Sequence, residues 1–191
     1  MKLGAIFAVL LGFTATTTSA ATLDFTEVGA TGIVPQTVIN LSNATITSFG
    51  DDTFIGAPGQ FGEANNLGIV CGSPVGSNKC EEGMQIDFLA DVSNLMFSSF
   101  AAVAGDNVLV EAFLNGGLLG SAIVTTDTMI DFSGFGLIDS LVFTDSSTSA
   151  GIGFGDFKFD ETGGVIPLPA TLPLMLGALA LMGFAGSRRR S

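Results

Sequence analysis

The last part of the chain, residues 164–191, has features that a soluble globular core does not accommodate. From Leu168 to Ala185 only Thr171 is polar, and the residues on either side of it form an almost continuous apolar run. As a helix, these 18 residues would extend roughly 27 Å, close to the lower limit for crossing a bilayer core. The run therefore predicts a single C-terminal transmembrane helix, and it confines any globular fold to the residues before it.

The apolar run overlaps a proline-containing segment and precedes a basic cluster. Pro167 and Pro169 favour an extended backbone over residues 166–170, because proline fixes its own φ and disfavours helix at the residue before it. The basic cluster consists of Arg188, Arg189 and Arg190. Arginines after a membrane span remain on the cytoplasmic side, where they also contact anionic headgroups. We expect an extended segment that binds in the cleft of a processing enzyme, followed by a stop-transfer anchor.

The tail resembles the bacterial PEP-CTERM sorting domain, also known as the ice-binding protein C-terminal domain, in its VPLPA variant. The residues that carry the resemblance are Ile166, Pro167, Leu168, Pro169 and Ala170, together with the apolar helix and the arginines. Leu168 replaces the glutamate of the commonest motif, and Ile166 replaces the usual valine. The resemblance implies that an exosortase, a membrane-embedded cysteine protease or transpeptidase, removes the tail. An ordinary membrane anchor is the alternative, but it leaves the Pro-Leu-Pro-Ala segment without a purpose.

The beginning of the chain has the pattern of a secretory signal peptide. Met1–Lys2 forms a short positive region, Leu3–Phe13 an apolar region, and Thr14–Ala21 a run of small residues. Cleavage after Ala20 or after Ala21 places small residues at positions −1 and −3 before the cleaved bond, where signal peptide cleavage requires them. An uncleaved N-terminal helix is the alternative, although its apolar run is short for a membrane span. We expect an exported protein, first an inner-membrane precursor with a periplasmic body and later at the cell surface or outside the cell.

The two signals divide the chain into a signal peptide (1–21), a body (22–163) and a sorting signal (164–191). The body has the size of one domain and carries 18 acidic residues against Lys79 and Lys158, a net charge of −16. Such a charge repels nucleic acids and anionic membrane surfaces, so nucleic acid is excluded as a partner.

The absence of three residue types narrows the chemistry of the protein. The chain has no His, Trp or Tyr, which excludes serine–histidine triads, cysteine–histidine dyads, histidine-based zinc motifs and most transition-metal sites. A glycosidase needs only two carboxylates, but its sugar subsites usually stack on Trp or Tyr. We therefore expect no enzymatic activity and no catalytic residues.

Cys71 and Cys80 are the only cysteines. An oxidising compartment outside the cytosol favours a disulfide between them. The eight residues that separate them are rich in turn formers, so the bond would hold a loop together, and the spacing differs from that of a redox pair. The predicted role of the disulfide is structural.

The body has the pattern of short strands separated by Gly, Pro, Asn and Asp. Expected strands in its first half are Leu23–Phe25, Thr37–Leu41, Ala44–Phe49, Thr53–Ile55 and Leu67–Val70. Expected strands in its second half are Met84–Phe88, Val108–Leu114, Ala122–Thr126, Ile138–Phe143 and Ile152–Phe159. Asn115–Gly117 predicts a tight hairpin turn, because Asn and Gly tolerate positive φ. About ten short strands predict an all-β sandwich or barrel.

The second half of the body resembles the jelly-roll β-sandwich modules of PEP-CTERM proteins, which are related to carbohydrate-binding modules. The resemblance lies in Phe113–Ser121, Ile138–Phe143 and the last strand around Asp156. It implies a jelly-roll-like β-sandwich. Strict alternation would place Phe157 and Phe159 on one face, and Asp156, Lys158 and Asp160 on the opposite, solvated face.

No cofactor is expected, with calcium as the one open alternative. Three acidic groups are candidates for it: Asp51–Asp52, Glu81–Glu82, and Asp156 with Asp160. None of them matches the EF-hand loop or the glycine-rich nonapeptide repeat, so the metal ligands stay unassigned.

Two functions fit these observations. The first is a non-catalytic surface or matrix protein, processed by an exosortase and associated with extracellular polysaccharide, with a structural or adhesive role. The second is a lectin-like module that binds a specific glycan, with or without calcium.

Overall fold

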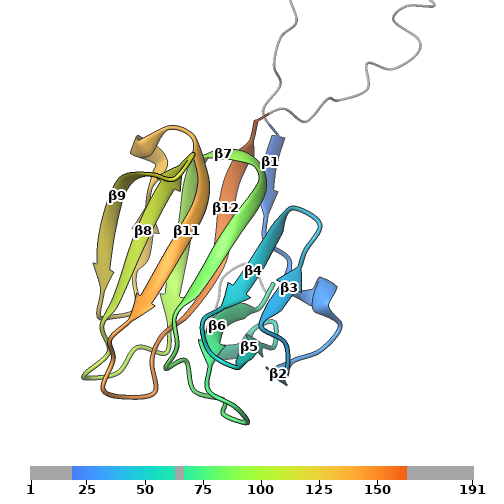
Figure 1. The fold of residues 1–191 in the computed structure, drawn as a ribbon, viewed down its shortest axis with the longest axis vertical. Coiled ribbons are helices and arrows are strands. Elements are labelled where there is room, and N and C mark those ends of the chain that lie inside the picture. Colours follow the sequence, from blue (N-terminus) through green and yellow to red (C-terminus); the bar gives the residue numbers. More distant parts are fainter. Residues whose placement is uncertain (1–18, 63–66, 163–191) are drawn as a thin grey trace, which may run out of the picture. The chain divides into compact units, whose positions relative to one another are not determined.

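The structure is a computed structural model that describes residues 19–62 and 67–162 (Figure 1). These residues belong to one compact unit and form antiparallel strands, with short 3-10 turns as the helical elements of the described ranges. The all-β class expected from the sequence is therefore confirmed. The sorting motif, the apolar run, the arginine cluster and most of the signal peptide lie outside the described residues.

The described strands are β1 (Ser19–Thr22), β2 (Gly32–Val34), β3 (Val38–Asn40), β4 (Ala44–Ser48), β5 (Asp52–Gly56), β6 (Ile69–Ser73), β7 (Met84–Phe100), β8 (Val108–Leu114), β9 (Gly117–Val124), β10 (Met129–Asp131), β11 (Ile138–Asp145) and β12 (Gly153–Glu161). The 3-10 turns are η1 (Phe25–Val28), η2 (Gln60–Gly62) and η3 (Ser133–Phe135). Neighbouring strands along the main path follow the order β2-β5-β6-β12-β7-β11-β8-β9.

Strand β7, with 17 residues, connects two groups of strands (Figure 1). Its first part, Met84–Phe88, pairs with β4 on one side and with β11 on the other. Its second part, Val92–Phe100, pairs with β12 and, near its end, with β10. One strand therefore has different neighbours at its two ends, which requires the sheet to bend or twist along β7.

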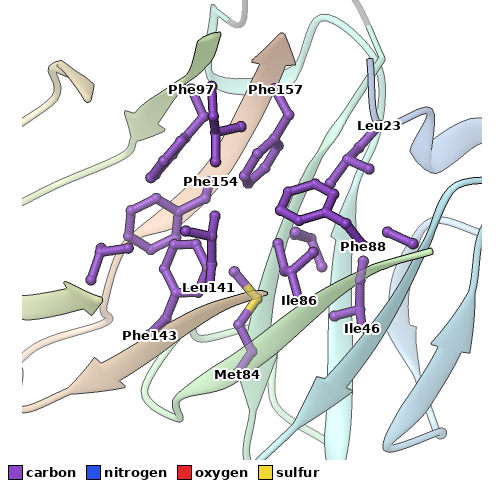
Figure 2. Close-up of a cluster of buried hydrophobic side chains, with 14 of the residues drawn as sticks. Leu23, Ile46, Met84, Ile86, Phe88, Phe97, Leu141, Phe143, Phe154 and Phe157 are labelled. Atoms are coloured by element: carbon purple, nitrogen blue, oxygen red, sulfur yellow. The ribbon is translucent and has the colours of Figure 1, made fainter. Parts of the chain in front are cut away.

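The core is built around phenylalanine side chains that come from several strands (Figure 2). The ring of Phe97 on β7 stacks on Phe157 of β12, with 5.0 Å between their centroids. Phe132, Phe143 and Phe154 approach the same ring with centroid distances of 5.7, 5.9 and 6.2 Å. All five rings are buried, and edge-to-face contacts of this kind stabilise beyond simple area burial.

The hairpin between β8 and β9 confirms the predicted turn. Leu114 pairs with Gly117, so Asn115 and Gly116 form a two-residue connection. Their φ angles are +51° and +74°. Positive φ at both positions is the geometry of the type I′ turn, whose twist matches that of the flanking strands.

Several expected strands differ from the structure. Ala122–Thr126 is replaced by β9, which begins at Gly117 directly after the hairpin turn and ends at Val124. The run Met84–Phe88 continues as β7 to Phe100. Asn94, within this strand, has a φ of +53°, and the buried positions change from Val92 to Leu95 and Phe97 across it, so the alternation that predicts a strand is broken there. Leu23–Phe25 is not a strand: the Asp24 side chain accepts a hydrogen bond from the Thr26 amide at 2.9 Å and begins the turn η1. An Asp side chain that bonds its own backbone in this way competes with strand pairing.

The predicted alternation along β12 is wrong at Asp156. This residue is only 7% exposed and has a φ of +54°, and the register with β7 shifts between Gly155 and Lys158. The irregularity brings Phe154 and Phe157, three residues apart, into the same core. Asp156 therefore does not lie on the solvated face, whereas Lys158 is exposed as expected.

Candidate functional site

Strand β1 overlaps the end of the predicted signal peptide, and β12 is the last described strand before the predicted sorting signal. These two strands are antiparallel neighbours (Figure 1). The ladder runs from Ser19 opposite Glu161 to Thr22 opposite Lys158. The predicted cleavage residues Ala20 and Ala21 lie inside this ladder, opposite Asp160 and Phe159. The part of the chain before β1 and the part after β12 therefore begin at the same end of one strand pair.

A groove of about 430 Å³ lies beside this ladder. Its lining consists of Ala20, Ala21, Thr22, Asn94, Met96, Lys158, Phe159 and Asp160. Asn94 donates a hydrogen bond from Nδ2 to Asp160 at 2.8 Å across the strands. Cleavage after Ala21 would remove two of the three β1 residues in the lining, so the complete groove is a feature of the unprocessed chain.

The predicted disulfide between Cys71 and Cys80 is present, with 5.3 Å between the Cα atoms. Both cysteines are buried in a small apolar cluster with Phe54, separate from the main core. The Cys80 amide donates to the Ala150 carbonyl at 2.7 Å. The bond therefore joins β6 to Cys80, whose backbone pairs with the segment that precedes β12, and its location agrees with the structural role expected from the sequence.

The three acidic groups considered for calcium lie in different settings. Asp52 is buried and accepts a hydrogen bond from the Gly76 amide at 2.7 Å. Glu81 forms an ion pair with Lys79 at 3.0 Å, and the side chains of both are at least one third exposed. Within residues 19–62 and 67–162, no three His, Cys, Asp or Glu side chains converge as metal ligands would. In the third group, Asp160 accepts a hydrogen bond from Asn94 and Asp156 is buried.

Asp106 is a buried carboxylate that was not predicted from the sequence. Asp106 is 4% exposed and accepts hydrogen bonds from the Val103 amide at 2.6 Å, from the Gly151 amide at 3.2 Å and from the Ser149 hydroxyl. It joins the loop before β8 to the loop before β12. Its position in Gly105-Asp106-Asn107, between two strands, is typical of a turn, and that was the only signal in the sequence.

One acidic group has a shifted pKa for a clear local reason. Hydrogen bonds from the side chain and the amide of Ser133 lower the pKa of Asp131, because they stabilise its charged form. The amide bond is 2.9 Å long and closes the turn after β10. Since this carboxylate is fully exposed, the shift reflects turn formation and not a catalytic environment.

None of the helical elements in the described residues is long and apolar enough to traverse a bilayer, and Leu168–Ala185 lies outside those residues. No family model matches the chain, and no curated protein is significantly similar to it.

Proposed function

We propose that the protein is an exported, non-catalytic surface or extracellular-matrix protein that an exosortase-type system sorts, with a structural or adhesive role. The observation that carries this proposal is the order of features in residues 164–191. A Pro-Leu-Pro-Ala segment, an apolar run that overlaps it and a terminal arginine cluster occur in this order. The apolar run attaches the precursor to the inner membrane, and the extended segment before it presents the bond to be cleaved.

In this proposal the body is a jelly-roll-like β-sandwich. The change of neighbours along β7 would divide the strands into two layers, one with β3, β4, β8, β9 and β11 and the other with β1, β2, β5, β6, β10 and β12. The phenylalanine cluster would fill the space between the layers. A rigid, acidic module with a disulfide suits a role outside the cell, where it associates with polysaccharide without catalysis.

Strand β1 (Ser19–Thr22) holds the end of the predicted signal peptide, 1–21, next to β12 in the unprocessed chain. Ser19 and Glu161 are direct neighbours, so the predicted cleavage residues Ala20 and Ala21 lie beside the last described strand, which precedes the predicted sorting signal.

Intact-mass analysis of protein from its native host and from exosortase-deficient cells tests this proposal. We expect loss of the N-terminal 20 or 21 residues in both strains, and loss of the tail only in the strain with the exosortase. The double variant Pro167→Ala/Pro169→Ala should keep its tail in both strains. Pro35→Ala, at an exposed proline in the body, is the matched control and should be processed normally. An intact tail in both strains for the unaltered chain would instead indicate an ordinary membrane anchor.

A second candidate function, glycan binding, is favoured by one exposed ring. Phe49 is 52% exposed, and its amide donates to the Gly83 carbonyl at 2.9 Å. The aliphatic part of the Glu82 side chain approaches Gly50, the residue after Phe49, so an acidic side chain lies in the same region as the exposed ring. An aromatic surface beside a few polar groups is a common arrangement for sugar binding.

A glycan array separates this second function from the first. If the protein is a lectin-like module, one oligosaccharide binds tightly and Phe49→Ala abolishes its binding. Phe61→Ala, which alters a ring of similar exposure (51%), should leave that binding unchanged. Association only with bulk matrix, and no single bound oligosaccharide, would favour the structural role.

A further inference from the structure

Strand β9 is a sheet edge (Figure 1), and it carries exposed apolar side chains. Among the described strands, β8 is its only partner, so the other edge of β9 has no described neighbour. Leu118 is 57% exposed and Ile123 is 71% exposed. An edge of this kind can receive another strand, because its backbone amides and carbonyls are free to extend the sheet.

The exposed side chains of the β8–β9 hairpin form one apolar face. Leu109 is opposite Ile123, and Phe113 is opposite Leu118, and residues in direct register share a face. Val108, Val110 and Ala112 of β8 are buried, which places the alternating residues 109, 111 and 113 on the outer side. Glu111, opposite Ser121, is the charged residue on this face of the hairpin.

The usual protection against edge pairing is weak in β9. Proteins guard exposed edges with charged residues, prolines or bulges, and residues 112–126 contain no charged residue and no proline. The register with β8 shifts at Leu119, where β9 has an extra residue. This bulge affects the start of the strand and leaves Gly120–Val124 as a regular, uncharged edge.

We propose that β9 pairs with β9 of a second copy of this chain in an antiparallel arrangement. The side chains of β9 favour a second copy of the strand over a cationic partner or a polysaccharide. A cationic partner would seek carboxylates, which β9 lacks, and a polysaccharide would seek polar groups, of which the β9 side chains offer only Ser121. A second β9 has the complementary surface, because it is also an uncharged apolar strand. Pairing through β9 also lets two bodies, each with a net charge of −16, meet at strands that carry no charge.

Symmetry adds a second apolar contact to the backbone pairing. When two identical strands pair antiparallel in one sheet, the two-fold axis is perpendicular to that sheet, and the contact is isologous. The outer faces of both copies then lie on the same side. Leu118 and Ile123 of each copy would form one apolar strip across the junction, and the dimer would join two sheets edge to edge.

Sedimentation of the full chain in nonionic detergent tests the proposal, with two variants of matched exposure. Ile123→Asp places a charge on the edge, and Val75→Asp places the same charge on a side chain that is 70% exposed elsewhere. We expect the unaltered chain to dimerise, and Ile123→Asp to weaken the dimer by more than about tenfold, a change of roughly 1.4 kcal/mol. Val75→Asp should dimerise like the unaltered chain. Higher salt should strengthen the dimer, because it screens repulsion between the acidic bodies.

Each remaining outcome contradicts the proposal. A monomer at all protein and salt concentrations would leave β9 without the inferred partner. A dimer that both variants weaken equally, or that neither weakens, would be formed by another surface. Leu118→Asp supplies a second variant of the same face, and circular dichroism verifies that each variant is folded. Because the readout is association and not tail removal, it is independent of the result for exosortase processing.

Discussion

At the scale of single residues, Gly151 has the strictest steric requirement. Its φ is +76°, and a Cβ atom placed on it would lie 1.5 Å from the Cys80 carbonyl oxygen. Its amide donates to Asp106 at 3.2 Å, so the residue also belongs to the hydrogen-bond network of that buried carboxylate. Glycine is therefore required here for two reasons, its backbone conformation and the close approach of Cys80.

Substitution of Gly151 by alanine should destabilise the protein strongly. The left-handed conformation alone costs about 1–2 kcal/mol for a residue with a Cβ atom. The contact with Cys80 adds to this cost because the atom that it meets is backbone, so we expect a total loss of more than about 3 kcal/mol or failure to fold. Urea unfolding followed by circular dichroism measures the change, since the chain has no Trp or Tyr for fluorescence.

Gly76→Ala is the matched control for this substitution. Its φ is +65°, but no atom lies within 4 Å of the added Cβ. The expected loss is about 1 kcal/mol, from the backbone conformation alone. Equal effects of the two substitutions would show that the close approach of Gly151 to Cys80 is unimportant.

At the scale of elements, the disulfide holds a turn-rich loop next to two strands. Cys71 lies in β6, and Cys80 forms a bridge with Gly151 just before β12. Phe54 of β5 packs on the two cysteines. The covalent bond thus supports a satellite cluster that the main core does not reach.

Removal of the disulfide should lower stability by about 2–3 kcal/mol, since a nine-residue separation closes a short loop. The double variant Cys71→Ser/Cys80→Ser should show this loss in urea unfolding. Reduction of the unaltered chain with dithiothreitol should produce a similar loss and should not affect the variant. A variant as stable as the oxidised protein would mean that packing around Phe54 is sufficient without the bond.

At the scale of the whole molecule, the phenylalanine cluster joins elements that are far apart in the sequence. Phe97 contacts rings from β11 and β12 (Figure 2), and also the ring of Phe132 between β10 and η3. Phe25, near the start of the described chain, lies 6.1 Å from Phe157 between ring centroids. Long-range contacts of this kind form only when most of the fold is in place.

Phe97→Ala should therefore reduce the free energy of unfolding by about 3–5 kcal/mol, because it leaves a cavity among closely packed rings. Phe49→Ala removes the same side chain from a position that is 52% exposed and should cost less than about 1 kcal/mol. Thermal unfolding followed by circular dichroism compares the two variants. Similar melting temperatures for both would contradict a core centred on Phe97.

Local signals predicted part of this structure and failed where the backbone departs from regular alternation. The Asn115–Gly116 turn and the Cys71–Cys80 pair were predictable, because turn chemistry and the oxidation of two lone cysteines depend on few residues. The second part of β7 and the burial of Asp156 were not, since positive φ at Asn94 and Asp156 changes which residues share a face.

The sequence by itself determined the all-β class, the hairpin and the disulfide, and it provides the evidence for terminal processing. These features depend on local periodicity, turn propensity and composition, which are properties of short segments. Only the tertiary structure decided that β1 lies beside β12, that Asp106 joins two loops and that β9 is an edge. Strand order and exposure depend on contacts between distant residues, and no local pattern encodes them.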